Sequence, residues 1–480
     1  MGDNLKERTA KGLFWGMLNN GTTQVLNILI GIFLGRLLSP EDYGMVGVLT
    51  IFTVIAGNLQ SSGFTQALVN MKAPTGRDYN SVFWFNTLSS VTIYAILFLL
   101  APLIAKFFHE PRLVSVSRFV FLSFLISSFG IAHNAYMLKN MMNREIAIVG
   151  FVALVVSGLT GIGMALRGWA YWSLAAQQVI YIAALNLGRY YYVPWRPQLK
   201  TDFGPVRQMF SFSVKILVTN IINTLSQHLL TFVFGRLFPI HAVGNYSQAN
   251  NWNSKANLFV SGTIGQVAQP VMVAAGNDRE RQQRVFRKLL RFTALLSFPV
   301  MLGLTLVGRE FIVLAIGEKW IESVGLLQVL CVGGAFLPLY TLYQNLAISS
   351  GRSDIYMWCN LAQIALQIAL VLAFSSRGMS VMVGVYTAFT ILWLAVWQWF
   401  ARRLIGLRYR DVALDVVPFF LIAAATMGLT WLLTRWISND ILLLAARVAL
   451  AAAIYLAMLK MSRAAILDEC LNFLTKKKTI

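Results

Sequence analysis

Apolar segments long enough to cross a lipid bilayer follow one another along nearly the whole of this 480-residue chain. A membrane-spanning helix needs about 20 mostly apolar residues, because the hydrocarbon core is about 30 Å thick. Only 12% of the residues are charged, whereas soluble proteins average about a quarter. Inside a bilayer the backbone must satisfy its own hydrogen bonds, so such segments are helices. The sequence therefore predicts an all-α polytopic membrane protein and excludes a soluble multidomain one.

The hydrophobic pattern predicts about 14 transmembrane helices. They cover residues 12–35, 45–69, 82–105, 113–137, 146–166, 169–188, 210–234, 243–274, 292–315, 323–348, 354–375, 380–401, 413–436 and 441–460. With the N-terminus inside, cytoplasmic segments carry 27 of the 40 Lys and Arg residues, external ends and loops carry 10, and three lie within spans. This positive-inside bias predicts that both termini are cytoplasmic. It also accounts for the net charge of +21 without a nucleic acid partner.

The residues that usually carry enzymatic chemistry are absent or scattered. Three Cys and four His residues have no metal-ligand spacing, and no phosphate-binding loop sequence is present. A membrane glycan polymerase or ligase is an alternative from another class, but it would need a long external loop, and none here exceeds about a dozen residues. We expect no enzyme, no cofactor and no metal. The sequence leaves the coupling ion open, with H⁺ and Na⁺ as the options.

A short motif occurs twice in one register. "GRLLSPEDYG" at 35–44 and "GRLFPIHAVG" at 235–244 match at an offset of 200 residues, which also pairs Asn20 with Asn220. Each copy ends the first span of a six-span half, so we expect two parallel six-helix repeats around a central cavity, plus two C-terminal helices. The predicted domains are 1–200 with a cytoplasmic linker, 201–410, and 411–480 with the extra helix pair and a basic tail. This architecture is typical of a transporter that works by alternating access.

The first copy of the motif also has the residues of an ordinary helix N-terminus, which is an alternative explanation for it. Ser39 is a good N-cap, Pro40 fits the first helical position, and Glu41 and Asp42 fall in the first turn. Two roles remain open for Arg36 and Arg236, which the repeat pairs. They are anchors that extend to the outer interface, or gate residues at the cavity mouth.

Lys255 lies near the middle of its predicted span. A charged residue there costs about 2.5–3.5 kcal/mol on insertion scales, which indicates a function. The surrounding stretch, "QANNWNSKANLFVSGTIGQ" at 248–266, is too polar to face lipid, and Asn251 and Asn253 stand beside the lysine. We favour a wet cavity wall over the alternative, a hydrogen-bond network that holds helices together.

A second polar face is predicted on the seventh span. Lys215, Asn223 and Gln227 fall near one face at multiples of four residues, and Asn220 lies between them. Extension of Lys215 to the inner interface is an equally good account. The first span adds three amides, Asn20, Gln24 and Asn27. Amide groups present both donors and acceptors, so these faces suit a hydroxyl-rich ligand such as a sugar.

No acidic residue stands at mid-depth in any predicted span. A cation exporter or a carboxylate proton relay would need such an acid in the bundle interior. The lysines favour an anionic ligand instead, because an ammonium group gains charge-assisted hydrogen bonds to phosphate. A multidrug exporter stays the alternative within transport.

The opening stretch at 11–52, "KGLFWGMLNNGTTQVLNILIGIFLGRLLSPEDYGMVGVLTIF", resembles Wzx-type polysaccharide flippases, especially the colanic-acid exporter branch. Their superfamily also contains multidrug extruders and lipid II flippases. The resemblance implies transfer of an undecaprenyl-pyrophosphate-linked oligosaccharide to the outer leaflet of a bacterial inner membrane. It implies membrane lipids, a polysaccharide polymerase and export machinery as partners.

The resemblance also assigns the pyrophosphate to cationic residues, which here are Lys255, Lys215 and Arg36. The candidate sugar-binding residues are Asn20, Gln24, Asn27, Asn220, Asn223, Gln227, Asn251 and Asn253. Relatives carry further charge in the N-terminal half of the cavity, but the second span here has none, so Arg36 would have to supply it. The two C-terminal spans correspond to a pair that relatives use for the lipid tail, with simple packing as the alternative.

Overall fold

The computed structural model describes residues 21–199, 202–274, 276 and 278–462, and within these ranges the side chains at 55–62 and at several positions between 208 and 275 are not described. Over the described ranges the chain is helical and contains no strand. The predicted all-α membrane fold is therefore confirmed.

The helices follow one another with short connections. After a first helix at Gly21–Leu37 they are α2 (Pro40–Asn70), α3 (Gly76–Phe107), α4 (Leu113–Lys139), α5 (Asn143–Leu166), α6 (Tyr171–Tyr192), α7 (Gly204–Leu237), α8 (Ile240–Ala274), α9 (Arg279–Ile316), α10 (Ile321–Gly334), α11 (Leu337–Ser349), α12 (Ser353–Ala373), α13 (Met379–Ile405), α14 (Tyr409–Thr434) and α15 (Asp440–Met461). Short 3₁₀ turns lie at Glu318–Trp320 and Ser375–Arg377.

Over the described residues, each of the predicted spans coincides with a helix or a pair of helices, the first of them from Gly21 onward. In the described part of the chain, nine candidate spans are long and apolar enough to cross a membrane. The exact number of crossings stays a prediction. The predicted span at 323–348 is broken into α10 and α11, and α9 is longer than predicted, with 38 residues or about 57 Å of helix rise. The basic stretch before residue 292 is therefore the first part of α9.

The start of α2 confirms the predicted cap. The Ser39 hydroxyl accepts a hydrogen bond from the Asp42 amide, and the Asp42 carboxylate accepts one from the Ser39 amide at 2.8 Å. This reciprocal capping box satisfies two amides that the first helical turn leaves open. The repeat-related helix, α8, begins at Ile240 without these residues.

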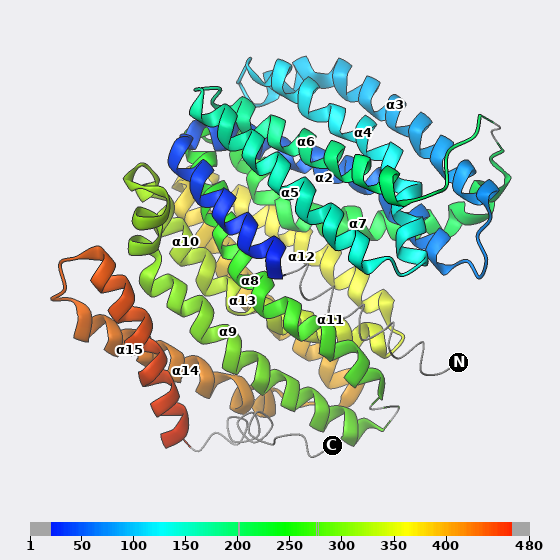
Figure 1. The fold of residues 1–480 in the computed structure, drawn as a ribbon. Coiled ribbons are helices and arrows are strands. Elements are labelled where there is room, and N and C mark those ends of the chain that lie inside the picture. The colour runs from blue at the N-terminus through cyan, green and yellow to red at the C-terminus, as the bar shows by residue number, and fades with distance from the viewer. Residues whose placement is uncertain (1–20, 200–201, 275, 277, 463–480) are drawn as a thin grey trace. The chain divides into compact units, whose positions relative to one another are not determined.

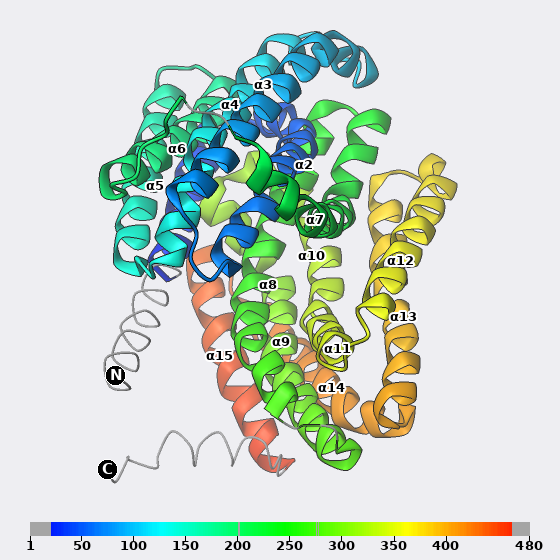
Figure 2. The same cartoon turned by 90° about the vertical axis from the view of Figure 1, so that its right-hand side faces the viewer.

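By their internal contacts the residues form two compact units, Met1–Ser247 and Gln248–Ile480, and the division falls within α8. In the first unit α2 packs along α7 and α4, and α5 packs along α6. Figures 1 and 2 show α3 and α4 lying side by side. The predicted division at 200 and 410 rests on the sequence repeat and stays a prediction.

The second unit is organised around α9. This helix contacts α10, α11, α14 and α15, and α14 packs along α15 (Figure 2). At the inner end predicted for α9, Arg287 Nε and Arg291 Nε each donate to the buried Asp415 carboxylate of α14 at 2.6 Å. The long helix and the C-terminal pair are therefore joined by charge as well as by apolar packing.

The segment between α6 and α7 is held against the first unit. Trp195 packs among Tyr79, Phe83 and His133 of α3 and α4. The Asn80 side chain accepts a hydrogen bond from the Gln198 amide at 2.8 Å, and the Gln198 carbonyl accepts one from Trp84.

Asp202 closes the same segment. Its carboxylate pairs with Arg77 of α3 and accepts the Gly204 amide at 2.8 Å. These contacts lower the pKa of the Asp202 carboxyl, the Gly204 hydrogen bond first and the Arg77 hydrogen bond second. The described residues of the linker predicted from its aromatic, proline and basic residues are thus fixed to α3 and α4 at Trp195, Gln198 and Asp202.

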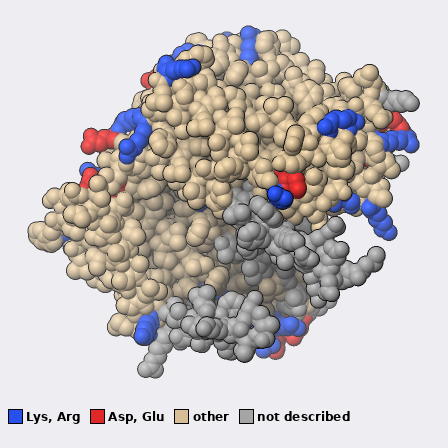
Figure 3. All heavy atoms as spheres, viewed as in Figure 1, with Lys and Arg blue, Asp and Glu red and all other residues tan. Residues whose placement is uncertain are grey.

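Charged side chains are sparse on the surface. On the face drawn in Figure 3, Lys, Arg, Asp and Glu form small separate groups, and uncharged surface extends between them. Large apolar side chains lie exposed along the helices, among them Leu99 at 74% and Leu392 at 71%. A surface of this kind suits a hydrocarbon solvent.

Candidate functional site

Within the second unit, α8 has a buried face and an open face. Trp252, Asn253 and Val260 are buried, whereas Asn251 and Phe259 are exposed, and Lys255 is half-buried between them. Asn251 and Lys255 are four residues apart and therefore stand one turn apart on one side of the helix. The polar stretch predicted as one cavity wall is thus divided between two environments.

The buried face of α8 compensates for a break in the tenth predicted span. Pro338 has no amide hydrogen, so the carbonyl of Gly334, four residues earlier, has no partner within the helix. Asn257 Nδ2 of α8 donates to this carbonyl at 2.9 Å. The neighbouring Ala335 carbonyl accepts the Ser297 hydroxyl of α9 at 2.7 Å. Asn257 therefore has a structural role, because it satisfies a carbonyl of α10.

Asn253 lies on the same buried face. A Cβ atom on Gly334 would stand 2.5 Å from the Asn253 Oδ1 atom and 2.5 Å from Met301 Cε, so the absence of a side chain at Gly334 makes room for the amide. Among the described residues, Asn253 Oδ1 has no hydrogen-bond partner. Asn253, one of the candidate sugar-binding residues, is thus packed inside the second unit and is only 6% exposed.

Lys255 lies near the middle of α8, where its Nζ atom stands 4.3 Å from the centre of the Trp252 ring. An ammonium group at this distance is attracted by the negative face of the ring. Trp252 in turn packs edge-on against Phe311 of α9, with ring centres 4.9 Å apart. The aromatic pair therefore fixes the position of the half-buried Lys255 ammonium beside the buried Trp252 ring.

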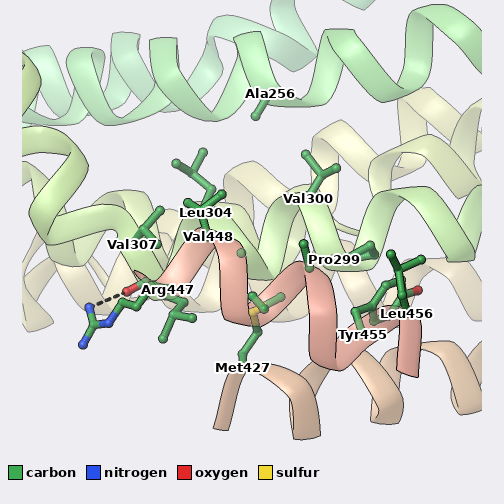
Figure 4. A pocket seen from close by; sticks show the side chains of 14 residues that line it. Ala256, Pro299, Val300, Leu304, Val307, Met427, Arg447, Val448, Tyr455 and Leu456 are labelled. Atoms are coloured by element: carbon green, nitrogen blue, oxygen red, sulfur yellow. Dashed lines mark hydrogen bonds between the residues drawn. The ribbon is translucent and has the colours of Figure 1, made fainter. Parts of the chain in front are cut away.

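An apolar groove opens in the second unit between α9 and α15. Its volume is about 570 Å³, and its wall includes Val300, Leu304 and Leu456 (Figure 4). Figure 4 shows Ala256 pointing from α8 toward α9. Ala256 follows Lys255 directly in the sequence, but Lys255 does not line the groove, since consecutive side chains of a helix point about 100° apart.

One end of the groove is closed by a buried ion pair. Arg447 Nη1 of α15 lies 2.7 Å from Glu310 Oε2 of α9, and the two side chains are 9% and 4% exposed. The same guanidinium donates to the Leu306 carbonyl at 3.1 Å and to Thr434 Oγ1 at 3.3 Å. Figure 4 shows it directed away from the groove. Arg447 therefore joins helices instead of facing the open space.

The described candidates of the first unit differ in their exposure. Gln24 and Arg36 are exposed on the first helix, and Asn27 is half-buried. Arg236, in the last turn of α7, contacts the His109 ring nitrogen and lies 5.4 Å from the centre of the Phe107 ring. Arg236 thus attaches α7 to the end of α3.

The other candidates cannot be placed. Asn20 lies outside the described residues, and so do the side chains of Lys215, Asn220, Asn223 and Gln227. No group of three or more His, Cys, Asp or Glu side chains suited to a metal occurs within 21–199, 202–274 or 278–462.

Sequence reasoning missed two arrangements for which signals were present. Glu310 and Arg447 stand at similar depths, five and six residues from the outer ends of their predicted spans, which is the signal for a buried pair. Pro338 inside a predicted span signals a broken helix that needs outside donors.

Comparison with known proteins gives a family model described as "Polysaccharide biosynthesis protein", which matches residues 33–325. The chain is 25% identical over 380 residues to an "Uncharacterized membrane protein in cps region" of Klebsiella pneumoniae, covering 78% of this chain and 77% of that protein. It is 24% identical over 429 residues to "Lipopolysaccharide biosynthesis protein WzxC" of Escherichia coli (strain K12), covering 87% and 86%.

Among solved structures, the fold is similar to "Lipid II flippase MurJ, inward closed conformation". The TM-score is 0.77 at 11% sequence identity, and the match covers 95% of this chain and all of that one. At this identity the likeness shows a shared fold.

Proposed function

This chain belongs to the polysaccharide biosynthesis protein family, and we propose that it turns an undecaprenyl-pyrophosphate-linked oligosaccharide from the inner to the outer leaflet of a bacterial inner membrane. The observation that carries the proposal is the family match, joined to a transporter fold over 95% of the chain. Membership confirms the resemblance drawn from residues 11–52 and places the protein among exporters, not among glycan polymerases or ligases.

The open face of α8 supplies the cation for the pyrophosphate in this proposal. Lys255 stands on that face, held by Trp252. A phosphate oxygen near its ammonium gains a charge-assisted hydrogen bond, and Asn251, one turn away and exposed, presents a donor and an acceptor to sugar hydroxyls. Lys215 and Arg36 remain the proposed additional cations, and Arg36 and Arg236 the proposed gate arginines.

We propose the groove between α9 and α15 for the polyprenyl tail. It is apolar, has a volume of about 570 Å³, and includes Ala256 of α8, the helix that carries Lys255. An isoprenoid chain is as apolar as this wall, so it can leave the lipid hydrocarbon for the groove at little cost.

In the same proposal the other candidate amides form hydrogen bonds to the sugar. Asn20, Gln24, Asn27, Asn220, Asn223, Gln227 and Asn253 are the remaining candidates. We propose cytoplasmic termini from the distribution of Lys and Arg, and a polysaccharide polymerase and export machinery as partners of the exported glycan.

The test is mass spectrometry of lipid extracts from cells that lack the protein. The proposal predicts a polyprenyl-pyrophosphate oligosaccharide that accumulates with its sugar inside the cell, and a return to normal levels when the wild-type chain is supplied. If no such lipid accumulates and sensitivity to small toxic compounds rises, the chain is a multidrug exporter instead.

A further inference from the structure

The turn from α13 to α14, in the second unit, carries a group of exposed cations. Arg402 and Arg403 lie in the last turn of α13, Arg408 precedes α14 and Arg410 is in its first turn. All four lie within five residues of the neighbouring ends of two predicted spans. The distribution of Lys and Arg predicts that this turn is cytoplasmic. We call these four residues the inner basic patch.

Aromatic side chains indicate the depth of the patch and orient one of its cations. The Arg403 guanidinium carbon stands 3.7 Å from the centre of the Trp399 ring, one turn earlier on α13. The Tyr409 hydroxyl donates to the Ala395 carbonyl at 2.9 Å, which joins the start of α14 to α13. Exposed Trp and Tyr residues are typical of the level where hydrocarbon meets lipid headgroups. A guanidinium stacked on a ring keeps the N–H groups at its edge available for a phosphate.

The acidic residues beside the patch are paired with α9. Asp415 of α14 is buried, and Arg287 Nε and Arg291 Nε each donate to its carboxylate at 2.6 Å. The Asp411 carboxylate lies 3.9 Å from Arg287 Nη1. The first part of α9 thus supplies the countercharge for these two acids. The cations of the patch therefore keep a positive potential at the surface.

An exposed apolar face continues from the patch along α14. Arg410, Leu414, Val417 and Leu421 follow one another at intervals of three and four residues, so they lie on one side of the helix. All four side chains are exposed. From Arg410 to Leu421 the helix rises by about 16 Å. A cation at the end of an apolar strip of this length matches a phospholipid, which has a phosphate at the end of its acyl chains.

We propose that the inner basic patch binds the phosphate of an anionic glycerophospholipid of the inner leaflet, with the acyl chains along the exposed face of α14. Arg403 and Arg410 are the residues assigned to the phosphate, because an ionised guanidinium gains charge-assisted hydrogen bonds to it. A nucleic acid or an acidic protein would contact the cations and leave the apolar face unused. The lipid is a bound component of the protein, not its cargo, so the inference goes beyond the proposed function.

Native mass spectrometry of the purified full chain tests the patch. The protein is offered phosphatidylglycerol or phosphatidylcholine with the same acyl chains. We expect several-fold more bound phosphatidylglycerol, and we expect this excess to disappear in Arg403→Gln with Arg410→Gln. Equal retention of the two lipids by the wild-type chain would overturn the proposal, because the charge would then not be recognised.

The matched control removes two exposed cations from the predicted outer end of the same unit, in Arg377→Gln with Arg435→Gln. Arg435 follows the other end of α14, and its guanidinium carbon stands 4.6 Å from the centre of the Trp436 ring. This variant has the same net charge as the inner one and should retain phosphatidylglycerol like the wild type. Equal losses in the two double variants would contradict a specific patch.

A second measurement uses the wild-type chain alone, so it holds even if the inner variant does not fold. Phosphatidylglycerol should raise the melting temperature in detergent more than phosphatidylcholine does. The difference should shrink as salt rises from about 0.1 M to 1 M, because the screening length falls from about 10 Å to 3 Å. A difference that does not change with salt would count against a charged headgroup as the ligand.

The acyl part of the site has its own variant. Leu414→Asn changes an exposed side chain next to the patch, so it should lower the retention of both phospholipids and leave the preference for phosphatidylglycerol. Unchanged retention of both lipids would separate the apolar face from the patch and overturn the proposed binding mode.

Undecaprenyl pyrophosphate distinguishes the two kinds of anionic lipid. A trace of it, added to an excess of phosphatidylglycerol, should leave the bound phosphatidylglycerol in place. Displacement by a trace would assign the patch to the transported lipid and overturn the phospholipid proposal. None of these assays measures export, so the proposed function stands or fails separately.

Discussion

On the buried face of α8, Asn257 donates to the Gly334 carbonyl that Pro338 leaves without a partner, whereas on the open face Lys255 lies over Trp252 with Asn251 exposed one turn away. The two faces draw on the same dense run of amides. The difference teaches that an amide side chain in such a helix can either bond to a neighbouring helix or stay open to a ligand. The hydrogen-bond partner of each side chain shows which of the two roles it has. Of the four predictions below, three test the two faces of α8 and one tests a buried cation of α15 for comparison.

Charge reversal at Lys255 should have the largest effect. Lys255→Glu replaces a charge-assisted hydrogen bond with repulsion of the pyrophosphate, so we expect glycan export to fall by at least about tenfold, as 1.4 kcal/mol requires. Membrane insertion should stay intact, because one ionised side chain replaces another in the same half-buried position. Lys255→Arg, which keeps the charge, is the control for export measured in cells. Normal export by Lys255→Glu would remove Lys255 from the site.

Arg447 provides the opposite case of a buried cation that serves the fold. Arg447→Ala leaves Glu310 buried and unpaired, so we expect a loss of about 3–5 kcal/mol in the free energy of unfolding, measured as a lower melting temperature in detergent. Arg309→Ala is the matched control. Its pair with Asp440 is exposed at 55% and 35% and contributes less than about 1 kcal/mol.

Replacement of both partners, Arg447→Leu with Glu310→Leu, should recover most of the stability, because no unpaired charge remains. A double variant as unstable as Arg447→Ala alone would show that the ion pair is not the cause.

Asn257→Ala tests the buried face. The Gly334 carbonyl would lose its donor inside the second unit, which costs about 1–3 kcal/mol of stability. Pro338→Ala in the same chain restores an amide hydrogen four residues after Gly334, so it should recover part of the loss. Thermal unfolding of the two single variants and the double variant gives the coupling between them. Additive effects would mean that Asn257 does not compensate for the proline.

Asn251→Ala should have the smallest effect on the protein itself. Its side chain is exposed, so the free energy of unfolding should change by less than about 0.5 kcal/mol. Export should fall by about twofold to tenfold, the equivalent of one neutral hydrogen bond to a sugar. The comparison of the two faces fails if Asn251→Ala lowers stability as much as Asn257→Ala does.

Much of the fold follows from the sequence because its determinants are local. Helix positions follow from apolar length, and the Ser39 cap follows from its neighbours, as the capping box confirms. The repeat also indicated two related halves. The close approach of the α2 and α8 backbones, where a Cβ atom on Gly244 would stand 3.0 Å from the Gly44 nitrogen, could not be predicted, since it depends on which helices become neighbours.

The candidate site was less predictable for the same reason. The density of amides on α8 indicated a polar environment, but the direction of each side chain depends on the helix opposite it. The structural role of Asn257 follows from its hydrogen bond to a carbonyl on α10, 77 residues away in the sequence. The structural role of Arg447 follows from its ion pair with Glu310, 137 residues away.

The segment between α6 and α7 has a consequence for how the chain can be divided. Gln198 is bonded to Asn80 of α3, and Asp202 is bonded both to Arg77 of α3 and to the Gly204 amide at the start of α7. The start of α7 is therefore held to α3 by a residue outside either helix. A chain break or an inserted tag next to Asp202 should separate these contacts and lower the stability of the first unit.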